Sequence, residues 1–425
     1  MQAAASTRGQ AVELIDALFL RHDEPAWLRQ RRLEAWRLHQ GPPTDSARLD
    51  ALLSERGSET LSRAGRVWSR GFGGLIEQRG MEIVSRSLGS EAAAQGIVFT
   101  DLHSAARGHS SLVRERLMSV VGPRENGDEA LNAALWSGGA FVYLPPDARA
   151  AEPLAYLVGG GGSAFRRVLL VAERGSGATF VEAVVSTGRG PAFSDSVIEI
   201  ALAEGARVRY IMLQDWGRST DCRFTLRAVL GEGSRLDLMV AGTGGAATRA
   251  KLDAVLGAPG ATARIVALEI AGGGQRLDYS TLQEHRAPET VSDFLFKSAL
   301  RGRARLQWRG LTRVERGASG ADANQESRSL LLSDRAQARP MPVLEIEAHD
   351  VSRCSHGATV SSLDEEQLFY LMSRGLSNSQ AETAIVEGFF RQALDRLNGD
   401  GVRRNIERVL WRRLRAKRRR RPDEE

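Results

Sequence analysis

The sequence predicts a mainly β protein in which a stacked β-solenoid lies between two helical regions. From about residue 165, short strands alternate with similar turns, and Gly177, Gly205, Gly233 and Gly260 are 28, 28 and 27 residues apart. Apolar residues alternate on both sides of these turns, as in VIEIAL and ARVRYIM around Gly205. A unit of this length cannot close a core alone, but stacking units about 4.8 Å apart buries a continuous apolar column. A β-sandwich is the alternative that the repeat leaves open.

The first region, residues 1–130, is expected to be helical, and the pattern covers residues 9 to about 90. GQAVELIDALFLRH is apolar at positions 12, 15, 18 and 19. In EPAWLRQRRLEAWRLHQGPP, Pro25 suits a first helical turn and the GPP that follows ends the helix. This second helix carries an apolar stripe that we expect to pack against the rest of the protein: Trp27, Leu28, Ala35 and Trp36.

Residues 131–362 are expected to form the solenoid, and residues 363–425 a C-terminal helical domain with a basic tail. DEEQLFYLMSRGLS has acids in its first turn and Gly375 as its stop, and NSQAETAIVEGFFRQALDRL follows as the partner helix of a hairpin. Beyond this hairpin, apolar residues at helical spacing form a stripe that can dock on the protein: Val402, Ile406, Val409, Leu410 and Leu414.

Composition and charge limit the functional classes. The chain has no run of eighteen uncharged apolar residues, and MQAAASTRGQ lacks the apolar segment of a signal peptide, so we expect a cytoplasmic protein that does not span a membrane. The formal net charge of +6 comes from residues 402–425, where eleven Arg or Lys face four acids, which leaves about −1 for the rest. The tail is therefore expected to be a solvated extension, and nucleic acid is the less favoured partner.

The stretch CSHGAT places Cys354 and His356 two positions apart. In a strand these positions share one face, roughly 7 Å apart at the backbone. Zinc and iron–sulfur sites commonly need four ligands, so the others would come from Cys222, His349, a carboxylate or a second subunit. The pair alone leaves three possibilities open: packing, a metal or cluster site, and a Cys–His nucleophile, which would need a third, orienting residue.

Longer segments resemble the SufB/SufD family of iron–sulfur cluster assembly proteins. They are LLLSDRAQARPMPVLEIEAHDVSRCSHGATVSSLDEEQLFYLMSRGLS, the upstream ALNAALWSGGAFVYLP, and RRVLLVAERGSGATFVE between them. EPAWLRQRRLEAW resembles the N-terminal helices of the SufD branch. The resemblance spans nearly the whole chain, and Cys-Ser-His at this place favours SufD over SufB.

The resemblance implies a right-handed parallel β-helix core and a scaffold subunit that does not itself hydrolyse ATP. A SufB-like protein would bind the end of the β-helix, and a SufC-like ATPase the terminal hairpin. A nascent iron–sulfur cluster would be shared with SufB, with His356 matching the family's interfacial ligand and Cys354 as a neighbouring thiol. The family's complexes also bind reduced flavin. The residues expected to hold SufC are Leu368, Phe369, Tyr370, Arg374 and Phe389.

One departure from the family pattern affects the geometry of the ligands. The pattern Asp-Asp-Val-x-Cys is one residue shorter than the segment 349–354, and one residue reverses strand facing, so we expect a β-bulge that keeps Cys354 and His356 on one face. Two rival functions are a SufB-like homodimeric scaffold and a β-helix polysaccharide lyase or hydrolase that uses carboxylates such as Glu347 or Asp350.

Overall fold

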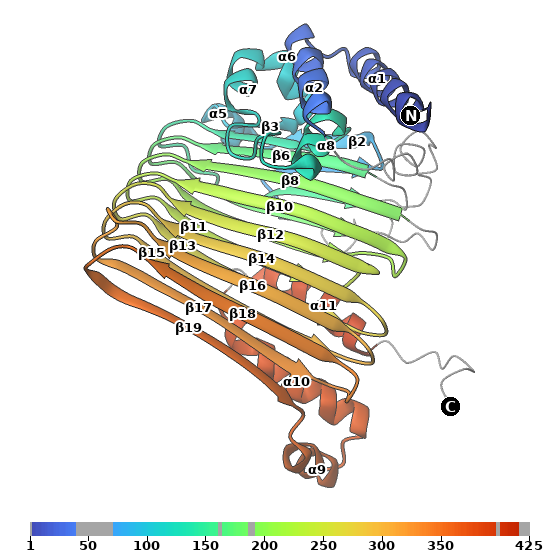
Figure 1. Ribbon diagram of the computed structural model, residues 1–425, viewed down its shortest axis with the longest axis vertical. Helices are drawn as coiled ribbons and strands as arrows, with labels where there is room; N and C mark the ends of the chain where they lie inside the picture. Colours follow the sequence, from blue (N-terminus) through green and yellow to red (C-terminus); the bar gives the residue numbers. More distant parts are fainter. Residues whose placement is uncertain (1, 40–70, 160–163, 186–191, 397–399, 416–425) are drawn as a thin grey trace.

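The protein is a parallel β-solenoid flanked by helices (Figure 1), as the repeat predicted. The computed structural model describes residues 2–39, 71–159, 164–185, 192–396 and 400–415. Each coil contributes one strand to each of two sheets. In the stack, odd-numbered strands pair with odd-numbered strands and even-numbered strands with even-numbered ones. The exceptions are at the first end, where β1 pairs with β2 and β3 with β4. The fold is therefore a solenoid and not a sandwich of hairpins.

The first sheet, sheet A, has ten strands in the order β19-β17-β15-β13-β11-β9-β7-β5-β1-β2. Their bounds are β1 Gly74–Arg79, β2 Glu82–Leu88, β5 Leu154–Gly159, β7 Gly177–Val185, β9 Arg207–Asp215, β11 Arg235–Gly242, β13 Thr262–Ala271, β15 Val291–Leu300, β17 Ala321–Leu331 and β19 Val351–Ser362. The second sheet, sheet B, has nine strands in the order β18-β16-β14-β12-β10-β8-β6-β4-β3. Their bounds are β3 Val98–Asp101, β4 Ala140–Leu144, β6 Ala164–Ala172, β8 Ala192–Leu202, β10 Thr220–Leu230, β12 Ala247–Leu256, β14 Arg276–His285, β16 Arg305–Val314 and β18 Gln337–Ile346.

Successive coils stack in register, which builds the core from columns of similar side chains. In sheet A, Tyr210, Leu238, Ile265 and Phe294 occupy one column, and all four are buried. Side chains in one column lie on the same face of the sheet, so the alternating pattern of each strand sends every second residue into the interior. The interior of the solenoid is thus the main apolar core.

The turn glycines stack as well, with one difference from the predicted spacing. Gly205, Gly233 and Gly260 all have a positive φ, and Gly205 lies over Gly175, which also has a positive φ. Gly177 instead begins β7 and pairs with Arg207. The predicted assignment of the first turn was therefore wrong by two residues, because ERGSG offers two glycines and only the turn position requires the left-handed conformation.

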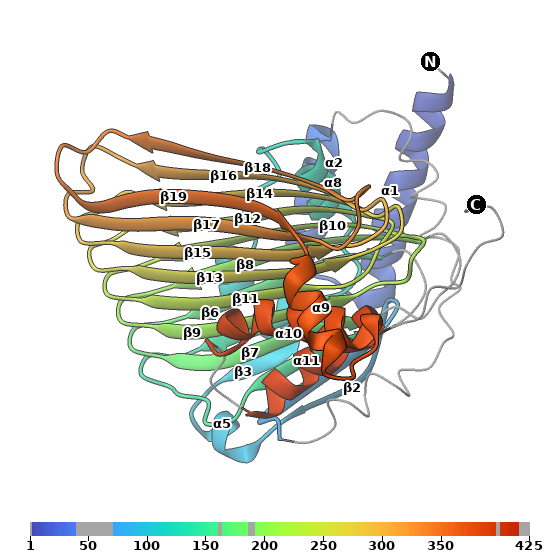
Figure 2. The same ribbon diagram turned by 90° about the horizontal axis from the view of Figure 1, so that it is seen from below.

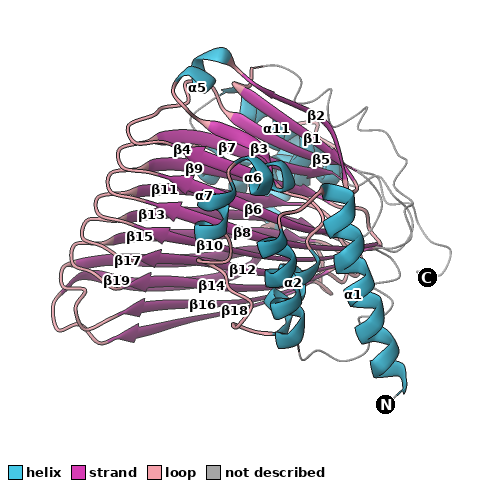
Figure 3. Cartoon of the chain, turned by 90° about the horizontal axis from the view of Figure 1, so that it is seen from above, coloured by secondary structure: helices cyan, strands magenta, loops and turns pink. Residues whose placement is uncertain are grey.

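Most helices of the N-terminal region pack on the outer face of sheet B, but the region is not purely helical (Figure 3). The helices are α1 Gln2–His22, α2 Ala26–Leu38, α5 Ser90–Ala94, α6 Leu102–Gly108, α7 Ser110–Arg116 and α8 Gly127–Leu135. Within the expected helical region 1–130, strands β1, β2 and β3 begin the two sheets. The prediction was wrong there because GLIEQRGMEIV forms a hairpin around Gly80, whose φ of 56° suits a tight turn. The part of the prediction that covers residues 40–70 lies outside the described residues.

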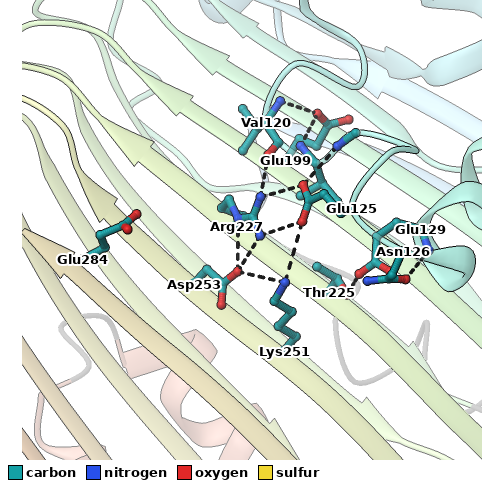
Figure 4. A network of polar contacts seen from close by, with 12 residues as sticks. Val120, Glu125, Asn126, Glu129, Glu199, Thr225, Arg227, Lys251, Asp253 and Glu284 are labelled. Carbon is teal, nitrogen blue, oxygen red and sulfur yellow. Dashed lines mark hydrogen bonds and ion pairs between the residues drawn. The ribbon is translucent and has the colours of Figure 1, made fainter. Parts of the chain in front are cut away.

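A polar network fixes the segment before α8 to sheet B (Figure 4). Arg227 of β10 binds both carboxylate oxygens of Glu125, at 2.6 and 2.8 Å, and also Asp253 of β12 at 2.8 Å. Glu199 of β8 accepts hydrogen bonds from three backbone N–H groups in residues 118–121. The bidentate pairing orients the segment, so the N-terminal region is joined to the solenoid by charge as well as by apolar packing.

Among the described residues, three helices follow the solenoid, and the last two cover the outer face of sheet A, on the opposite side of the strands from the N-terminal helices (Figure 2). The three helices are α9 Glu365–Ser373, α10 Asn378–Leu394 and α11 Asp400–Arg415. The stripe predicted in α11 is confirmed, because Ile406, Val409, Leu410 and Leu414 are buried and Val402 packs against them. Arg412 and Arg413 bind the buried carboxylate of Asp215. Part of the basic charge of residues 402–425 thus attaches α11 to the solenoid.

The two ends of the solenoid differ. At the first end, β2 and β3 pair antiparallel with β1 and β4, and β2 carries charged side chains such as Arg86, which binds Asp101. At the second end, β18 and β19 form the last coil, and no strand of the described residues pairs with their outer edges. Exposed sheet edges are open to pairing with another chain unless they are blocked. The second end is therefore the open end of the molecule.

Candidate functional site

The predicted pair Cys354 and His356 lies in β19, the edge strand of sheet A at the open end. The ladder between β17 and β19 is regular except at one place, where Ala321 pairs with Val351 and the next residue, Asp322, pairs with Arg353. Ser352 is thus the extra residue of a β-bulge, and its hydroxyl donates to the carbonyl oxygen of Gly320 at 3.1 Å. The predicted bulge is confirmed.

The bulge directs both side chains of the pair to the interior face of the last coil. Cys354 pairs with Ala323 and His356 with Gln325, and both partners are buried interior residues of β17. Residues paired in a parallel ladder share one face, so the thiol and the imidazole face the same way. His356 is nevertheless exposed, because no further coil covers it.

The uncovered interior positions of the last coil include apolar side chains. Ile346 of β18 is 44% exposed and Val360 of β19 is 41% exposed, although the residues that they pair with, Val314 and Ser329, are buried. Exposed apolar groups that continue an interior column are typical of a protein–protein contact surface. The open end thus exposes residues that correspond to buried core positions in the preceding coil.

Cys354 is half-buried against a small apolar cluster that contains Val314, Ala318 and Ala321. This burial raises the pKa of the Cys354 thiol. Metal ligation requires the thiolate, so binding of iron at this position must displace the proton. His356 differs, because a neutral imidazole is already a ligand and its side chain is exposed.

A third polar group lies beneath His356, and the sequence reasoning missed it. Gln325, its ladder partner, is fully buried and donates through Nε2 to the carbonyl oxygen of Val343 at 2.9 Å. Its Oε1 atom has no hydrogen-bond partner among the described residues. A buried acceptor without a partner is costly, so this oxygen is available to a donor at the open end. The signal in the sequence was a glutamine at an interior position of ADANQES.

Other residues considered as ligands do not join this pair. Cys222 is buried in the core of β10, which is separated from β18 by three strands of sheet B, so it lies well inside the stack. That possibility was wrong, because sequence distance gave no information about the coil in which Cys222 lies. His349 and Asp350 are exposed in the turn before β19. The described residues contain no group of three or more His, Cys, Asp or Glu that could hold a metal ion.

The two strand edges at the open end are not equivalent. The backbone N–H groups of Gln337 and Glu347 donate to the carbonyl oxygens of Ala304 and Val314, on the side of β16. Because N–H groups alternate in direction along a strand, the even-numbered residues of β18 direct theirs outward. Two of these positions are Pro340 and Pro342, which have no N–H to donate. Just after β19, the N–H of Leu363 donates to the carbonyl oxygen of Leu331 at the end of β17. N–H groups alternate in direction along a strand, so the odd-numbered residues of β19 donate to β17, and Cys354 and the following even-numbered residues direct their N–H groups outward. The edge of β19 can therefore accept a strand, whereas that of β18 is interrupted.

The terminal hairpin presents the residues expected to hold an ATPase. No residue of α9 is buried, and Phe369 and Tyr370 are 74% and 56% exposed. Arg374 caps the helix and stacks over the Tyr370 ring at 5.2 Å. Leu368 is half-buried. Phe389 of α10 is half-buried against Lys297, whose Nζ lies 4.9 Å from its ring, so this residue is partly used within the chain.

Comparison with known proteins identifies the family. A family model described as the SufBD core domain of the SUF system for FeS cluster assembly matches residues 156–389. The chain belongs to the SufBD family. An iron–sulfur cluster assembly SufBD family protein of Staphylococcus epidermidis is 30% identical over 417 residues, covering 90% of this chain and 89% of the relative. A relative from Staphylococcus saprophyticus is 32% identical over 324 residues, covering 74% of this chain and 69% of the relative. The iron–sulfur cluster assembly protein SufB of Bacillus subtilis is 28% identical, with coverage of 90% and 89%.

The SufBD core match contains Cys354, His356, Gln325 and the whole open end of the solenoid. As a member of this family, the chain is an iron–sulfur cluster assembly protein, which gives no support to the polysaccharide lyase alternative. The relatives carry names of the common family or of SufB, so membership alone does not choose between the SufB and SufD branches. Among the described residues, no helix is long and apolar enough to cross a bilayer.

Proposed function

We propose that this SufBD protein is a SufD-like scaffold subunit without ATPase activity, which completes an iron–sulfur cluster site together with a SufB-like partner. In this proposal the partner binds the open end, a SufC-like ATPase binds the terminal hairpin, and the complex works in the cytoplasm. The Cys-Ser-His sequence at 354–356 and the tryptophan-containing helix α2 support the SufD branch. The cluster is the cargo of the complex and not a resident cofactor of this chain.

The observation that carries the proposal is the uncovered last coil with two potential ligands on its interior face. His356 is exposed there, and Cys354 lies beside it with a thiol whose pKa burial has raised. A partner strand on the β19 edge would cover Val360 and would bring its own side chains to the imidazole. The site is thus complete only when two chains meet.

The chemistry of the ligand set suits a cluster that must be released. Two ligands from one chain hold iron weakly, since iron–sulfur clusters commonly have four protein ligands. If the other ligands come from the partner, a change at the interface removes several ligands at once and weakens binding. Gln325 is proposed as a positioning residue whose free Oε1 accepts a hydrogen bond from the His356 ring. Reduced flavin belongs to the complex in this proposal, and no residue of this chain is assigned to it.

The terminal hairpin is the proposed contact for the SufC-like ATPase. Phe369 and Tyr370 are large, exposed and supported by a capped helix, which is the type of residue that dominates binding energy in interfaces. Leu368, Arg374 and Phe389 are the further proposed contacts. ATP hydrolysis is assigned to that partner, not to this chain.

Anaerobic reconstitution of the co-purified complex tests the cluster role. Complexes with His356→Ala, Cys354→Ala and the parent chain are loaded with iron and sulfide, and cluster content is followed by visible absorption and iron analysis. We expect the histidine change to lower cluster content severalfold and the cysteine change to lower it less, because the thiol must first lose its proton. The matched control is His349→Ala, which removes an exposed imidazole in the turn outside β19.

Equal cluster content in the parent, His356→Ala and the double variant with Cys354→Ala would contradict the proposal. So would an equal loss with His349→Ala, because the effect would then come from removing any surface imidazole. A Gln325→Ala variant that lowers cluster content only when His356 is present would support its positioning role.

A SufB-like homodimeric scaffold is the second candidate, favoured by the similarity to the SufB protein of Bacillus subtilis. Co-expression with SufB-like and SufC-like proteins of the same organism distinguishes the two. Light scattering of the purified complex is expected to give one copy of this chain beside one SufB-like chain. A complex with two copies of this chain and no SufB-like protein would select the homodimer.

A further inference from the structure

A groove lined by arginines lies on the outer face of sheet B, away from Cys354 and His356. Its volume is about 600 Å³, and it follows the beginnings of strands β10 to β18. Four exposed arginines contribute to it, one from each of the four neighbouring strands β12, β14, β16 and β18: Arg249, Arg276, Arg305 and Arg339. The proposed assembly function does not use this groove.

The positive charge of the groove is not balanced as it is elsewhere on the same face. Arg309 binds Asp278, and Arg313 binds Glu284 and Glu345. Within the described ranges, none of the four groove arginines makes an ion pair or a side-chain hydrogen bond. Two acids line the groove, and one of them, Asp278, is already bound to Arg309, which leaves only the carboxylate of Asp221 to balance the four arginines. The groove therefore carries an excess of positive charge.

The register of the sheet brings these charges together. Arg276 and Arg305 are direct partners in the ladder between β14 and β16. Like charges at directly opposite positions destabilise a sheet, so this pair costs stability unless an anion lies between them. Arg249 and Arg339 lie at the ends of the row Arg249–Asp278–Gln307–Arg339, three ladder steps or roughly 14 Å apart. Such an arrangement suits an elongated anion better than a single small ion.

The other lining residues indicate the chemistry of the ligand. Guanidinium groups bind phosphate oxygens in a bidentate manner, and Gln307 and Gln337 add amide donors. Phe193, Leu277 and Leu306 supply apolar wall, and a volume of this size is typical of small-molecule sites. Because the charges beyond the groove are paired, the face offers no continuous basic track for a nucleic-acid backbone.

We propose that this groove binds an organic diphosphate of nucleotide size, with Arg276 and Arg305 on the diphosphate. Arg249 and Arg339 bind the remaining polar groups of the ligand. The proposal does not rest on the cluster role, because the groove uses the outer face of sheet B and the cluster site the interior face at the end of β19.

Titration calorimetry of the full chain, without the ATPase partner, tests this proposal with ADP, AMP and inorganic pyrophosphate as probes. We expect ADP to bind more tightly than AMP, and the double variant Arg276→Gln, Arg305→Gln to weaken ADP binding at least tenfold. The matched control, Arg207→Gln with Arg316→Gln, removes two other exposed arginines and should bind ADP like the parent. Without ligand, the groove variant should melt above the parent because the repulsion between opposite arginines is gone.

No binding of ADP or pyrophosphate by the parent would overturn the proposal, and so would an equal loss of binding in the control variant. Tighter binding of duplex DNA than of ADP, lost in the groove variant, would assign the surface to nucleic acid instead. Circular dichroism of both double variants shows whether the fold is retained, and the melting temperature in the presence of ADP gives a second readout: it should rise for the parent and the control but not for the groove variant.

Discussion

At the scale of single residues, the interior of the solenoid holds polar side chains, and one of them is a carboxyl group that has a hydrogen bond but no ion pair among the described residues. Glu269 of β13 is buried and accepts a hydrogen bond from the hydroxyl of Tyr279. The neighbouring position in β11 is Gly242, and the end of the Glu269 side chain occupies the space where a Cβ atom of residue 242 would lie. Burial raises the pKa of Glu269 to about 7. This acid is therefore half-protonated near neutral pH in the folded chain.

Glu269→Gln tests this raised pKa. The folded chain keeps a proton that the unfolded chain loses above pH 4.5, so the free energy of unfolding falls as pH rises from 4.5 to 7 and stays lower above pH 7. Glutamine cannot ionise and keeps an acceptor for Tyr279. We expect the variant to be more stable than the parent by about 3 kcal/mol at pH 8 and equal to it below pH 4. Urea unfolding at both pH values measures the difference, and equal stability at pH 8 would contradict the account.

The site residues show what single positions reveal in a sequence. Cys354 and His356 could be found because both are rare in this chain and lie two positions apart. The bulge at Ser352 could be found by counting residues against a family pattern. Gln325 could not, because its role depends on which residue of another strand lies beside it. The register between β17 and β19 depends on the number of residues in each coil and not on any local sequence pattern.

At the scale of elements, the last two strands differ in their capacity to pair. The outward positions of β18 include Pro340 and Pro342, whereas the outward positions of β19 all keep their N–H groups. Proline on an edge is a common way to prevent strand addition. At the open end, β19, the strand of His356, is therefore the edge better able to accept a further strand.

Ala358→Pro tests which edge pairs with the partner. Ala358 directs its N–H outward, so proline there removes no hydrogen bond within the chain but blocks a partner strand. We expect at least tenfold weaker binding of the SufB-like partner in titration calorimetry, with an unchanged circular dichroism spectrum. Ala338→Pro, at an outward position of β18, is the matched control and should have little effect. Equal weakening by both variants would show that the two edges contribute alike.

The elements also show where sequence patterns suffice. The helix α9 was predicted because acids in the first turn and a terminal glycine act locally, and Asp364 also caps it. The strands β1 to β3 were missed because segments of four to seven residues are too short to show a clear strand pattern beside the helical segments around them. The long repeat was visible because each coil repeats the same turn.

At the scale of the whole molecule, the two ends of the stack differ in how completely the core is covered. The first end is finished by antiparallel strands with charged side chains, and the second leaves Val360, Ile346 and the buried acceptor of Gln325 without cover. The faces of the two sheets are largely occupied by helices near the first end and along sheet A. The open end is thus the surface of the solenoid at which interior positions of a coil lack cover.

Hydrogen–deuterium exchange of β19 in the free chain and in the complex with the SufB-like and SufC-like proteins measures the proposed completion of this end most directly. We expect peptides covering residues 354–362 to exchange quickly in the free chain and to become strongly protected in the complex, while peptides of β18 change less. Unchanged exchange in β19, with protection confined to other surfaces of the solenoid, would contradict the central claim that a second chain completes the open end.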